Sequence, residues 1–175
     1  SLPGVSELAT GKVTVNDLME IDLRDLLGRK QVEPNINLLK INISNKVVLV
    51  TGAGGSIGSE LCRQILSLNP KIIILYEISE PSLYMIEQEL SKIMPNAKVI
   101  PLLGSVLDKD RFEGICEFYS VNTVYHAAAY KHVPLVELNP SQGILNNAIG
   151  TMMAATAAIS SNVETFVLVS TDKAV

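Results

Sequence analysis

The stretch that decides the fold is VVLVTGAGGSIG, residues 47–58. A β-branched apolar run stops at a cluster of glycines, and apolar residues then recur at helical spacing, at Ile57, Leu61 and Ile65. This pattern predicts a strand, a tight turn and a helix. The glycines have the Gly-x-x-Gly-x-x-Gly spacing of a dinucleotide-binding βαβ unit, where the backbone approaches a pyrophosphate at the helix N-terminus.

The composition indicates a globular protein with a substantial core. The chain has 175 residues, of which 47% are hydrophobic and 18% charged, with a net charge of −4. This balance argues against a nucleic-acid-binding protein, which would normally carry a basic patch. Cys62 and Cys116 lack the spacing of metal ligands, so we expect no metal site and interpret both as buried thiols in a reducing compartment. With no signal peptide and no bilayer-length apolar run, we expect a cytoplasmic protein.

Apolar strands and helical patterns alternate from Lys46 to the last residue. This alternation predicts an α/β fold with a Rossmann-like, doubly wound parallel sheet, covered by helices on both faces. Ser79 and Asp108 are expected N-caps. The expected strands are 46–51, 71–76, 97–102, 122–126 and 164–170, and the expected helices are 56–68, 80–94, 108–119 and roughly 140–160.

Residues 1–45 differ from the rest of the chain, and we assign the domain to 46–175. A short amphipathic stretch ends at Gly28, and Pro34 with several asparagines then predicts a linker leading to the first strand. Residues 1–45 are therefore expected to be an arm that packs on the domain surface or a tether to an absent upstream region.

The glycine turn and the next strand end supply most of the candidate cofactor ligands. Glu77 follows 25 positions after Gly52. An acidic residue at about this distance can bind the adenosine ribose hydroxyls and repel a 2′-phosphate. Since no Arg lies within 77–91, the sequence favours NAD over NADP. Glu80 is a competing candidate, and a solvated carboxylate is the alternative. The candidates in the turn are Gly52, Gly54, Gly55, Ser56, Ile57 and Gly58.

Further candidates follow the third and fourth strands. Ser105 and Val106 could meet the adenine edge, although a helix-capping loop would explain them equally well. Three small residues, Ala127, Ala128 and Ala129, would let the nicotinamide ribose lie against the backbone. Beyond them, Lys131 and His132 are candidates for binding an anionic substrate, and Asn147 is a polar candidate on a helix of small apolar residues. We interpret His126, at the strand end, as a packing residue.

The fifth strand ends in Thr171, Asp172 and Lys173. A hydroxyl, a carboxylate and an amine at the C-terminal end of a central strand form a candidate acid–base set. Burial near a cofactor could move the pKa of the carboxyl up or that of the amine down, toward neutrality. The alternative is a helix cap followed by a surface lysine.

With these residues the chain resembles the extended short-chain dehydrogenase/reductase superfamily. Within it, the chain is similar to the nucleoside-diphosphate-sugar 4,6-dehydratases of polysaccharide biosynthesis. The resemblance covers about 46–175, and residues 1–33, notably 25–29, resemble the segment before the catalytic domain in long, membrane-anchored members. The matching stretches are TGAGGSIG at 51–58, Ser79-Glu80 with Leu83-Tyr84, HAAAYKHVPLVE at 126–137, Asn147 with Gly150-Thr151, and VSTDKAV at 169–175.

The resemblance implies a lyase that uses tightly bound NAD(P) and acts on a UDP-N-acetylhexosamine, first of all UDP-N-acetylglucosamine. Oxidation at carbon 4 acidifies the proton on carbon 5, the carbon-6 hydroxyl leaves as water, and hydride returns to carbon 6. By position, Lys173 would be the base at carbon 5 and Asp172 the acid that helps water depart. Thr171 would hydrogen-bond the 4-hydroxyl, and Lys131 is a further substrate contact.

The superfamily's Tyr-x-x-x-Lys pair, whose Tyr some long members replace by Met, would follow Val175. We therefore expect activity from a longer parent protein and none from this piece alone. The resemblance also implies a homo-oligomer, with the parent anchored at the cytoplasmic face of the bacterial inner membrane. Two alternatives stay open: a UDP-sugar 4-epimerase, which has no need for Asp172 and Lys173 beside carbons 5 and 6, and a non-catalytic NAD(P)-binding module.

Overall fold

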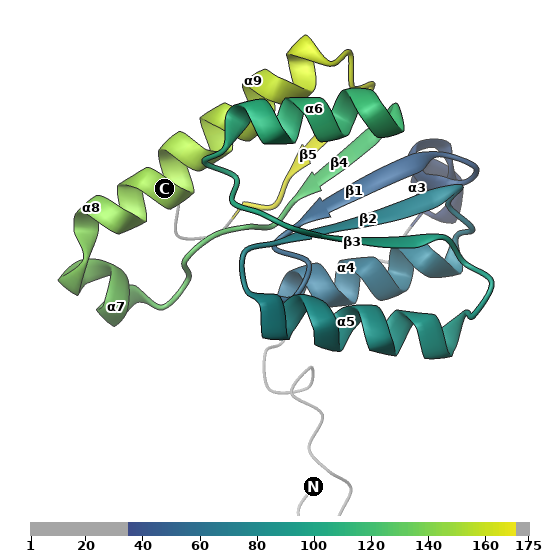
Figure 1. The fold of residues 1–175 in the computed structure, drawn as a ribbon, viewed down its shortest axis with the longest axis horizontal. Helices are drawn as coiled ribbons and strands as arrows, with labels where there is room; N and C mark the ends of the chain where they lie inside the picture. Colours follow the sequence, from purple (N-terminus) through teal and green to yellow (C-terminus); the bar gives the residue numbers. More distant parts are fainter. Residues whose placement is uncertain (1–34, 171–175) are drawn as a thin grey trace, which may run out of the picture. The chain divides into compact units, whose positions relative to one another are not determined.

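A single parallel sheet organises residues 35–170, the part of the chain that the computed structural model describes (Figure 1). The strand order is β3-β2-β1-β4-β5. The predicted Rossmann-like α/β fold is thus confirmed, and each predicted strand boundary lies within two residues of the observed one. The strands are β1 (Val47–Thr51), β2 (Ile72–Glu77), β3 (Val99–Leu103), β4 (Thr123–His126) and β5 (Thr165–Leu168).

Helices cover both faces of the sheet. In Figure 1, α4 and α5 lie on one face and α6 and α9 on the other, while α7 and α8 extend beyond the ends of the strands. No helix within 35–170 is long and apolar enough to span a bilayer. The helices are α3 (Ile36–Ile43), α4 (Ser56–Ser67), α5 (Glu80–Ile93), α6 (Lys109–Tyr119), α7 (Val133–Leu138), α8 (Pro140–Gly143), the π-helical η2 (Ile144–Ile149) and α9 (Gly150–Ser160).

Helix α3 lies where the sequence predicted a linker, so that prediction is wrong. The asparagines that suggested a linker begin and end this helix. The side chain of Asn35 accepts hydrogen bonds from the backbone N–H groups of Asn37 and Leu38, at 3.1 and 3.3 Å. Asn45 has a φ of 59°, in the left-handed region that Asn tolerates better than most residues. Ile43 is buried in the core, which fastens the helix to the domain.

The core has two layers because alternate residues of each strand point to opposite faces. Val48 and Val50 face the layer beneath α4 and α5, whereas Leu49 faces the layer beneath α6 and α9. Each layer holds one free thiol, Cys62 in the first and Cys116 in the second. Burial raises the pKa of both thiols to about 12. The prediction of buried thiols is confirmed, and neither is a thiolate at neutral pH.

The outer strand β3 contains Pro101, which pairs in register with Leu75 of β2. Backbone N–H groups along a parallel strand point alternately to the two sides. The carbonyl of Lys98 accepts from the N–H of Ile73, and the N–H of Gly104 donates to the carbonyl of Glu77, so the even-numbered residues along β3 face β2. By this alternation the position of Pro101 faces away from β2, where a missing N–H costs no ladder hydrogen bond.

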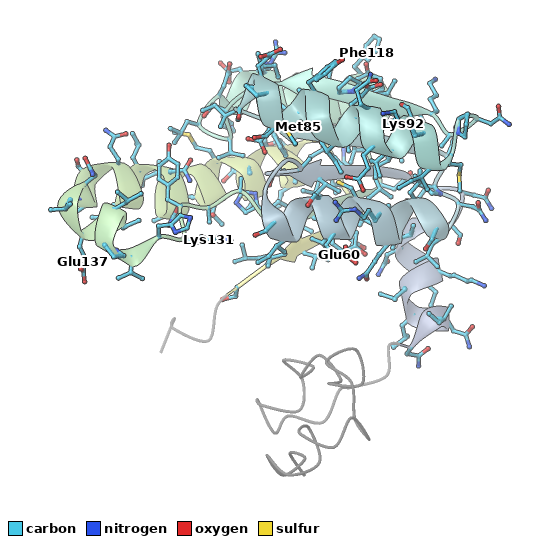
Figure 2. The ribbon with its side chains drawn as sticks, turned by 90° about the horizontal axis from the view of Figure 1, so that it is seen from below. Glu60, Met85, Lys92, Phe118, Lys131 and Glu137 are labelled. Carbon is cyan, nitrogen blue, oxygen red and sulfur yellow. The ribbon has the colours of Figure 1, made fainter. Side chains whose placement is uncertain are left out.

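Replacing Leu49 by Ala should destabilise the domain strongly. Leu49 is fully buried in β1, so the substitution removes apolar contacts and leaves a cavity, a loss of about 2–5 kcal/mol in the free energy of unfolding. Phe118→Ala is the control, because Phe118 on α6 is 81% exposed (Figure 2). This control should change the same free energy by no more than about 0.5 kcal/mol. Urea unfolding measures both, and equal losses would contradict the assigned core.

Candidate functional site

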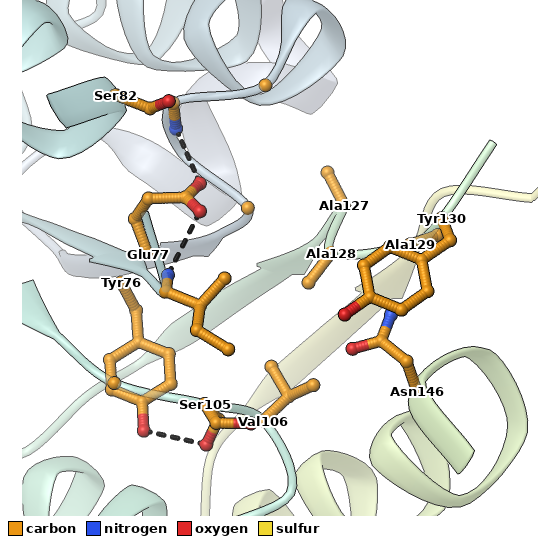
Figure 3. Close-up of a pocket in the computed structure, with 15 residues that line it drawn as sticks. Tyr76, Glu77, Ser82, Ser105, Val106, Ala127, Ala128, Ala129, Tyr130 and Asn146 are labelled. Atoms are coloured by element: carbon orange, nitrogen blue, oxygen red, sulfur yellow. Dashed lines mark hydrogen bonds between the residues drawn. The ribbon is translucent and has the colours of Figure 1, made fainter. Parts of the chain in front are cut away.

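A pocket lies at the C-terminal ends of the strands, where the strand order reverses direction between β1 and β4 (Figure 3). Open α/β sheets bind their ligands at this kind of position. Nine of the predicted cofactor ligands line the pocket, and they come from the C-terminal ends of four strands or from the loops that follow them. They are Gly52, Gly54, Gly55, Glu77, Ser105, Val106, Ala127, Ala128 and Ala129.

The glycine turn is tight at two positions for steric reasons. Gly52 has a φ of +63°, and a Cβ there would lie 2.8 Å from the backbone nitrogen of Ala128. A Cβ at Gly58 would lie 2.0 Å from the carbonyl oxygen of Gly52. Gly58 therefore lets α4 pack against the end of β1, and it does not line the pocket. Neither position could hold a residue with a side chain unless the backbone moved.

The first helical turn of α4 presents unpaired backbone N–H groups next to the glycine turn. Gly55 is the N-cap of α4 and provides no side-chain cap, and the first intrahelical bond goes from Ser59 N–H to the Gly55 carbonyl. The N–H groups of Ser56, Ile57 and Gly58 consequently have no intrahelical acceptor. The exposed side chains of Ser56 and Ile57 do not line the pocket. Any contribution of these residues to an anion site would come from their backbone and the helix dipole.

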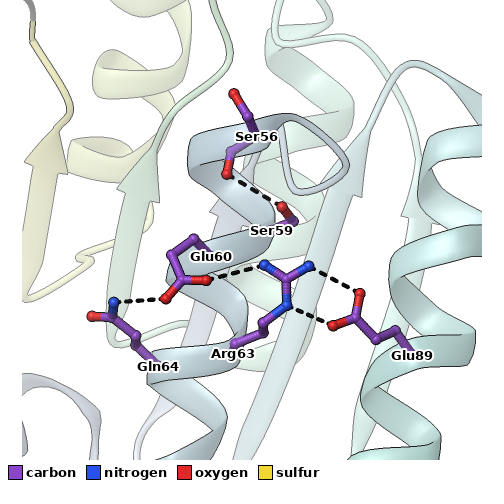
Figure 4. Close-up of polar contacts among 6 residues, drawn as sticks. All are labelled: Ser56, Ser59, Glu60, Arg63, Gln64 and Glu89. Carbon is purple, nitrogen blue, oxygen red and sulfur yellow. Dashed lines mark hydrogen bonds and ion pairs between the residues drawn. The ribbon is translucent and has the colours of Figure 1, made fainter. Parts of the chain in front are cut away.

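Helix α4 is also tied to its neighbour α5 by a polar cluster (Figure 4). The guanidinium of Arg63 contacts Glu89 on α5, with Nη2 to Oε2 at 3.0 Å, and Glu60 on α4, with Nη1 to Oε2 at 3.1 Å. The hydrogen bond from Arg63 lowers the pKa of the Glu89 carboxyl. Because these groups are solvent-exposed, the cluster contributes little to the free energy of unfolding.

The carboxylate of Glu77 connects the glycine turn to the end of β2 by hydrogen bonds. Its side chain is only 8% exposed and accepts three backbone hydrogen bonds. Oε2 accepts from Gly54 at 2.9 Å, and Oε1 accepts from Ile78 and Ser79 at 2.9 and 3.0 Å. Oε2 can still accept one more bond, so the predicted contact with a ribose remains chemically possible. The competing candidate Glu80 is exposed and lies outside the pocket lining.

Tyr76 fixes the loop after β3. Its hydroxyl donates to the carbonyl of Ser105 at 2.9 Å, and burial raises the pKa of this phenol. A Cβ at Gly104 would lie 2.4 Å from that hydroxyl, so the loop passes directly over the ring. The hydroxyl of Ser105 accepts from Leu107 at 3.2 Å, which agrees with the loop-stabilising alternative, while buried Val106 forms part of the pocket wall.

Asn147 holds the loop after β4 instead of facing the pocket. Its Oδ1 accepts from the backbone N–H of Tyr130 at 2.8 Å, and its Nδ2 donates to the Tyr130 carbonyl at 2.9 Å. The neighbouring Asn146 lines the pocket in its place. Both lie in η2, and a π-helical turn changes which residues share a face, so a period of 3.6 residues could not have predicted this exchange.

The two predicted substrate ligands are exposed and lie beside the pocket. Lys131 donates from Nζ to the hydroxyl of Ser56 at 2.6 Å, which brings an ammonium group to the start of α4. His132 is the N-cap residue of α7 and makes no side-chain cap bond. An ammonium group and a helix N-terminus both attract negative charge, so their proximity favours an anionic ligand.

The predicted acid–base set, Thr171, Asp172 and Lys173, lies outside the described residues. The backbone reaches the same edge of the sheet just before it. Val169 N–H donates to the carbonyl of His126 at 3.0 Å, beyond the end of β5 at Leu168. The catalytic roles of the three residues stay predictions.

Six pocket residues were not among the candidate ligands chosen from the sequence. Three of them, Ile78, Gly104 and Tyr130, directly follow strand ends or predicted ligands, and position alone could have indicated them. The others needed tertiary structure: a Cβ on Gly54 would lie 2.4 Å from Cβ of Ser82, for example, which places Ser82 against the turn. The six residues are Tyr76, Ile78, Ser82, Gly104, Tyr130 and Asn146.

Within 35–170, no three His, Cys, Asp or Glu side chains cluster as metal ligands would.

Comparison with known proteins assigns the chain to a family. Residues 48–175 match the family described as polysaccharide biosynthesis protein. The chain belongs to this family. The family resemblance inferred from the sequence motifs is confirmed, and the family's relatives include nucleotide-sugar dehydratases and epimerases.

Three relatives show what the chain is similar to. It is 45% identical over 175 residues to the capsular polysaccharide biosynthesis protein CapD of Staphylococcus aureus, covering 99% of this chain and 29% of CapD. It is 33% identical over 132 residues to an inverting UDP-N-acetylglucosamine 4,6-dehydratase of Campylobacter jejuni. It is also 33% identical over 133 residues to a UDP-glucose 4-epimerase of Rickettsia rickettsii. Each of the last two matches covers 75% of this chain and 38% of the relative.

A solved structure agrees with the fold. The chain matches UDP-glucose 4-epimerase of Stenotrophomonas maltophila with a TM-score of 0.67 and 24% identity, over 73% of this chain and 37% of that one. The chain therefore spans between 29% and 38% of the length of the relatives reported above. At this identity the match supports the arrangement of strands and helices and says nothing of activity.

Gly58→Ala should destabilise the protein, whereas Gly114→Ala should not. Both glycines lie in helices, but a Cβ at Gly58 would meet a backbone oxygen and a Cβ at Gly114 in α6 would meet nothing within 4 Å. We expect Gly58→Ala to lower the free energy of unfolding by at least about 1–3 kcal/mol. Gly114→Ala should raise it by about 0.5–1 kcal/mol through helix propensity. Thermal unfolding of both variants measures this, and a neutral Gly58→Ala would refute the tight turn.

Proposed function

We propose that the protein is an NAD-dependent UDP-N-acetylglucosamine 4,6-dehydratase that forms a 4-keto-6-deoxy sugar nucleotide for polysaccharide biosynthesis. The observation that carries the proposal is the pocket at the reversal point of the sheet, built on a glycine turn, in a member of the polysaccharide biosynthesis family. The 33% identity to a UDP-N-acetylglucosamine 4,6-dehydratase supports the choice of reaction.

The pocket has suitable groups for each part of NAD. The free N–H groups at the start of α4 would bind the pyrophosphate. Oε2 of Glu77 would accept from a ribose hydroxyl, and its negative charge disfavours a 2′-phosphate. Ile78 and Val106 offer apolar surface for the adenine, and the small side chains of Ala127 to Ala129 leave the backbone open to the other half. When bound, NAD supplies a reversible hydride acceptor.

The chemistry beside the cofactor is assigned to the segment after β5. Lys173 would remove the proton from carbon 5 once carbon 4 is a ketone. Asp172 would protonate the carbon-6 hydroxyl so that it leaves as water, and Thr171 would hydrogen-bond the 4-hydroxyl. These roles rest on the resemblance of the VSTDKAV string at 169–175 and on its place directly after β5 in the sequence. Among the described strands β5 is an outer one, and not the central strand expected from the sequence.

A UDP-sugar 4-epimerase is the second candidate, since the relative named UDP-glucose 4-epimerase is as similar as the dehydratase, at 33% identity. Both reactions pass through a 4-ketone. Only the dehydratase requires an acid and a base beside carbons 5 and 6, and Asp172 with Lys173 supports that reaction.

Incubation of the full-length protein with UDP-N-acetylglucosamine in deuterated water, followed by proton NMR, tests the proposal. We expect a new methyl signal, deuterium at carbon 5 and a 4-keto carbon. Formation of UDP-N-acetylgalactosamine without a methyl signal would instead establish an epimerase. Bound cofactor without any product would reject this substrate and, if other sugar nucleotides also fail, would favour a non-catalytic module.

Glu77→Gln should shift cofactor preference toward NADP. The substitution keeps the size of the side chain and removes the charge that opposes a 2′-phosphate, so the ratio of NADP to NAD affinity should rise about tenfold. The ratio of the two affinities is used because a general loosening of the glycine turn would weaken the binding of both cofactors alike. Glu80→Gln is the matched control, because it removes an equal charge three residues away, outside the lining. Calorimetric titration with both cofactors measures the ratio, and equal shifts in the two variants would contradict the role of Glu77.

A further inference from the structure

A buried histidine connects three elements behind the pocket. His126, at the end of β4, is 1% exposed and stacks against Phe166 of β5 at a ring distance of 5.7 Å. Both of its ring nitrogens bind threonine hydroxyls. Nδ1 lies 2.9 Å from Oγ1 of Thr51, its register partner at the end of β1. Nε2 lies 3.0 Å from Oγ1 of Thr151 in the first turn of α9.

The surrounding hydrogen bonds assign the proton of the ring. The hydroxyl of Thr151 donates its one proton to the carbonyl of Asn147 at 2.7 Å, so its oxygen can only accept from the ring. Nε2 therefore carries the proton. On the other side, Oγ1 of Thr51 already accepts from the N–H groups of Ala127 and Ala128, at 3.2 and 3.3 Å. Its own proton is then directed at Nδ1, which accepts.

The assigned charge state agrees with the burial of the ring. Burial lowers the pKa of His126 to about 4, so the ring is neutral at physiological pH. A doubly protonated ring would turn Nδ1 into a donor and leave the hydroxyl proton of Thr51 without this acceptor.

Both ends of the chain of hydrogen bonds meet the same loop. At one end, Thr51 receives the N–H groups of Ala127 and Ala128, two residues of the pocket lining. At the other end, Asn147 accepts from Thr151 through its backbone and holds both backbone groups of Tyr130 through its side chain. The loop after β4 is thus fixed at its first two residues and again at Tyr130 by one connected set of groups.

We propose that His126 is a positioning residue: as a neutral ring with its proton on Nε2, it couples the hydroxyl of Thr151 to that of Thr51 and so holds the backbone of Ala127 and Ala128 in the pocket wall. The coupling is a property of this chain's own residues. Its effect on NAD affinity, in contrast, rests on the proposed function.

The test compares two threonines of α9 in the full-length protein. Thr151→Val removes the acceptor for Nε2–H. Thr156→Val is the matched control, because the Thr156 hydroxyl makes the same bond to the carbonyl four residues earlier, at 2.7 Å, on an exposed part of the same helix. Thr151→Ser restores the hydroxyl. Hydrogen exchange of the amides at 127–130 is the first readout, and the NMR resonances of ¹⁵N-labelled His126 are the second.

We expect Thr151→Val to accelerate exchange at Ala128, whose N–H donates to Oγ1 of Thr51, about tenfold, with Thr156→Val and Thr151→Ser within about twofold of the natural protein. Ala127 should respond less, because its N–H also donates to the carbonyl of Thr51 at 3.2 Å. In the natural protein the nitrogen resonances should show a protonated Nε2 and an unprotonated Nδ1. Equal exchange in Thr151→Val and Thr156→Val, or a proton on Nδ1 in the natural protein, would overturn the proposal. The second result needs no variant, so it decides even if Thr151→Val fails to fold.

NAD affinity separates this proposal from the function on which part of it rests. If the natural protein binds NAD, Thr151→Val should weaken binding about tenfold and Thr151→Ser should restore it. Unchanged NAD binding together with accelerated exchange would overturn the effect on the cofactor while leaving the coupling intact. If the natural protein does not bind NAD, the proposed function fails, and the exchange and NMR results still decide the role of His126.

Discussion

The close approach of α4 to the end of β1 is the constraint on which the pocket depends. Only a residue without a side chain fits where Gly58 faces the carbonyl oxygen of Gly52. That contact sets the turn between them, and two other loops attach to the same turn. Glu77 from β2 binds the N–H of Gly54, and the backbone at Ala128 packs against Gly52. A larger residue at the contact would therefore disturb loops from three strands at once.

Polar groups are buried at the strand ends, whereas the two faces of the sheet are apolar. Three of the four buried polar side chains among the described residues, Thr51, Glu77 and His126, lie at the C-terminal ends of their strands. All of the buried side-chain polar atoms within 35–170 have hydrogen-bond partners. Burial of a polar group is tolerated under this condition, and the resulting bonds have fixed directions. The apolar faces of the sheet thus supply the stability of the domain, and the hydrogen bonds at the C-terminal ends of the strands set the shape of the pocket.

The sequence was sufficient for the strands, because buried parallel strands are continuous apolar runs that glycines and capping residues interrupt. It also indicated most of the pocket, since ligands of such sheets lie where strands end. It did not reveal the pairing of Thr51 with His126, which depends on β4 lying beside β1. The sequence identified Asn147 as a candidate, but it did not indicate its partner. In the structure Asn147 lies in the π-helical η2 and binds the backbone of Tyr130. The α3 helix was missed because asparagine favours linkers and helix ends alike.

Pro101 limits how the sheet can associate with other chains. The exposed edge of an outer strand normally offers a row of free N–H and C=O groups, and a second strand can add there. On β3 the middle of that row lacks its donor, because the proline nitrogen faces outward. Strand addition at this edge would be interrupted after one or two hydrogen bonds. The proline thus protects β3 against intermolecular β-pairing and aggregation, without weakening the pairing between β3 and β2.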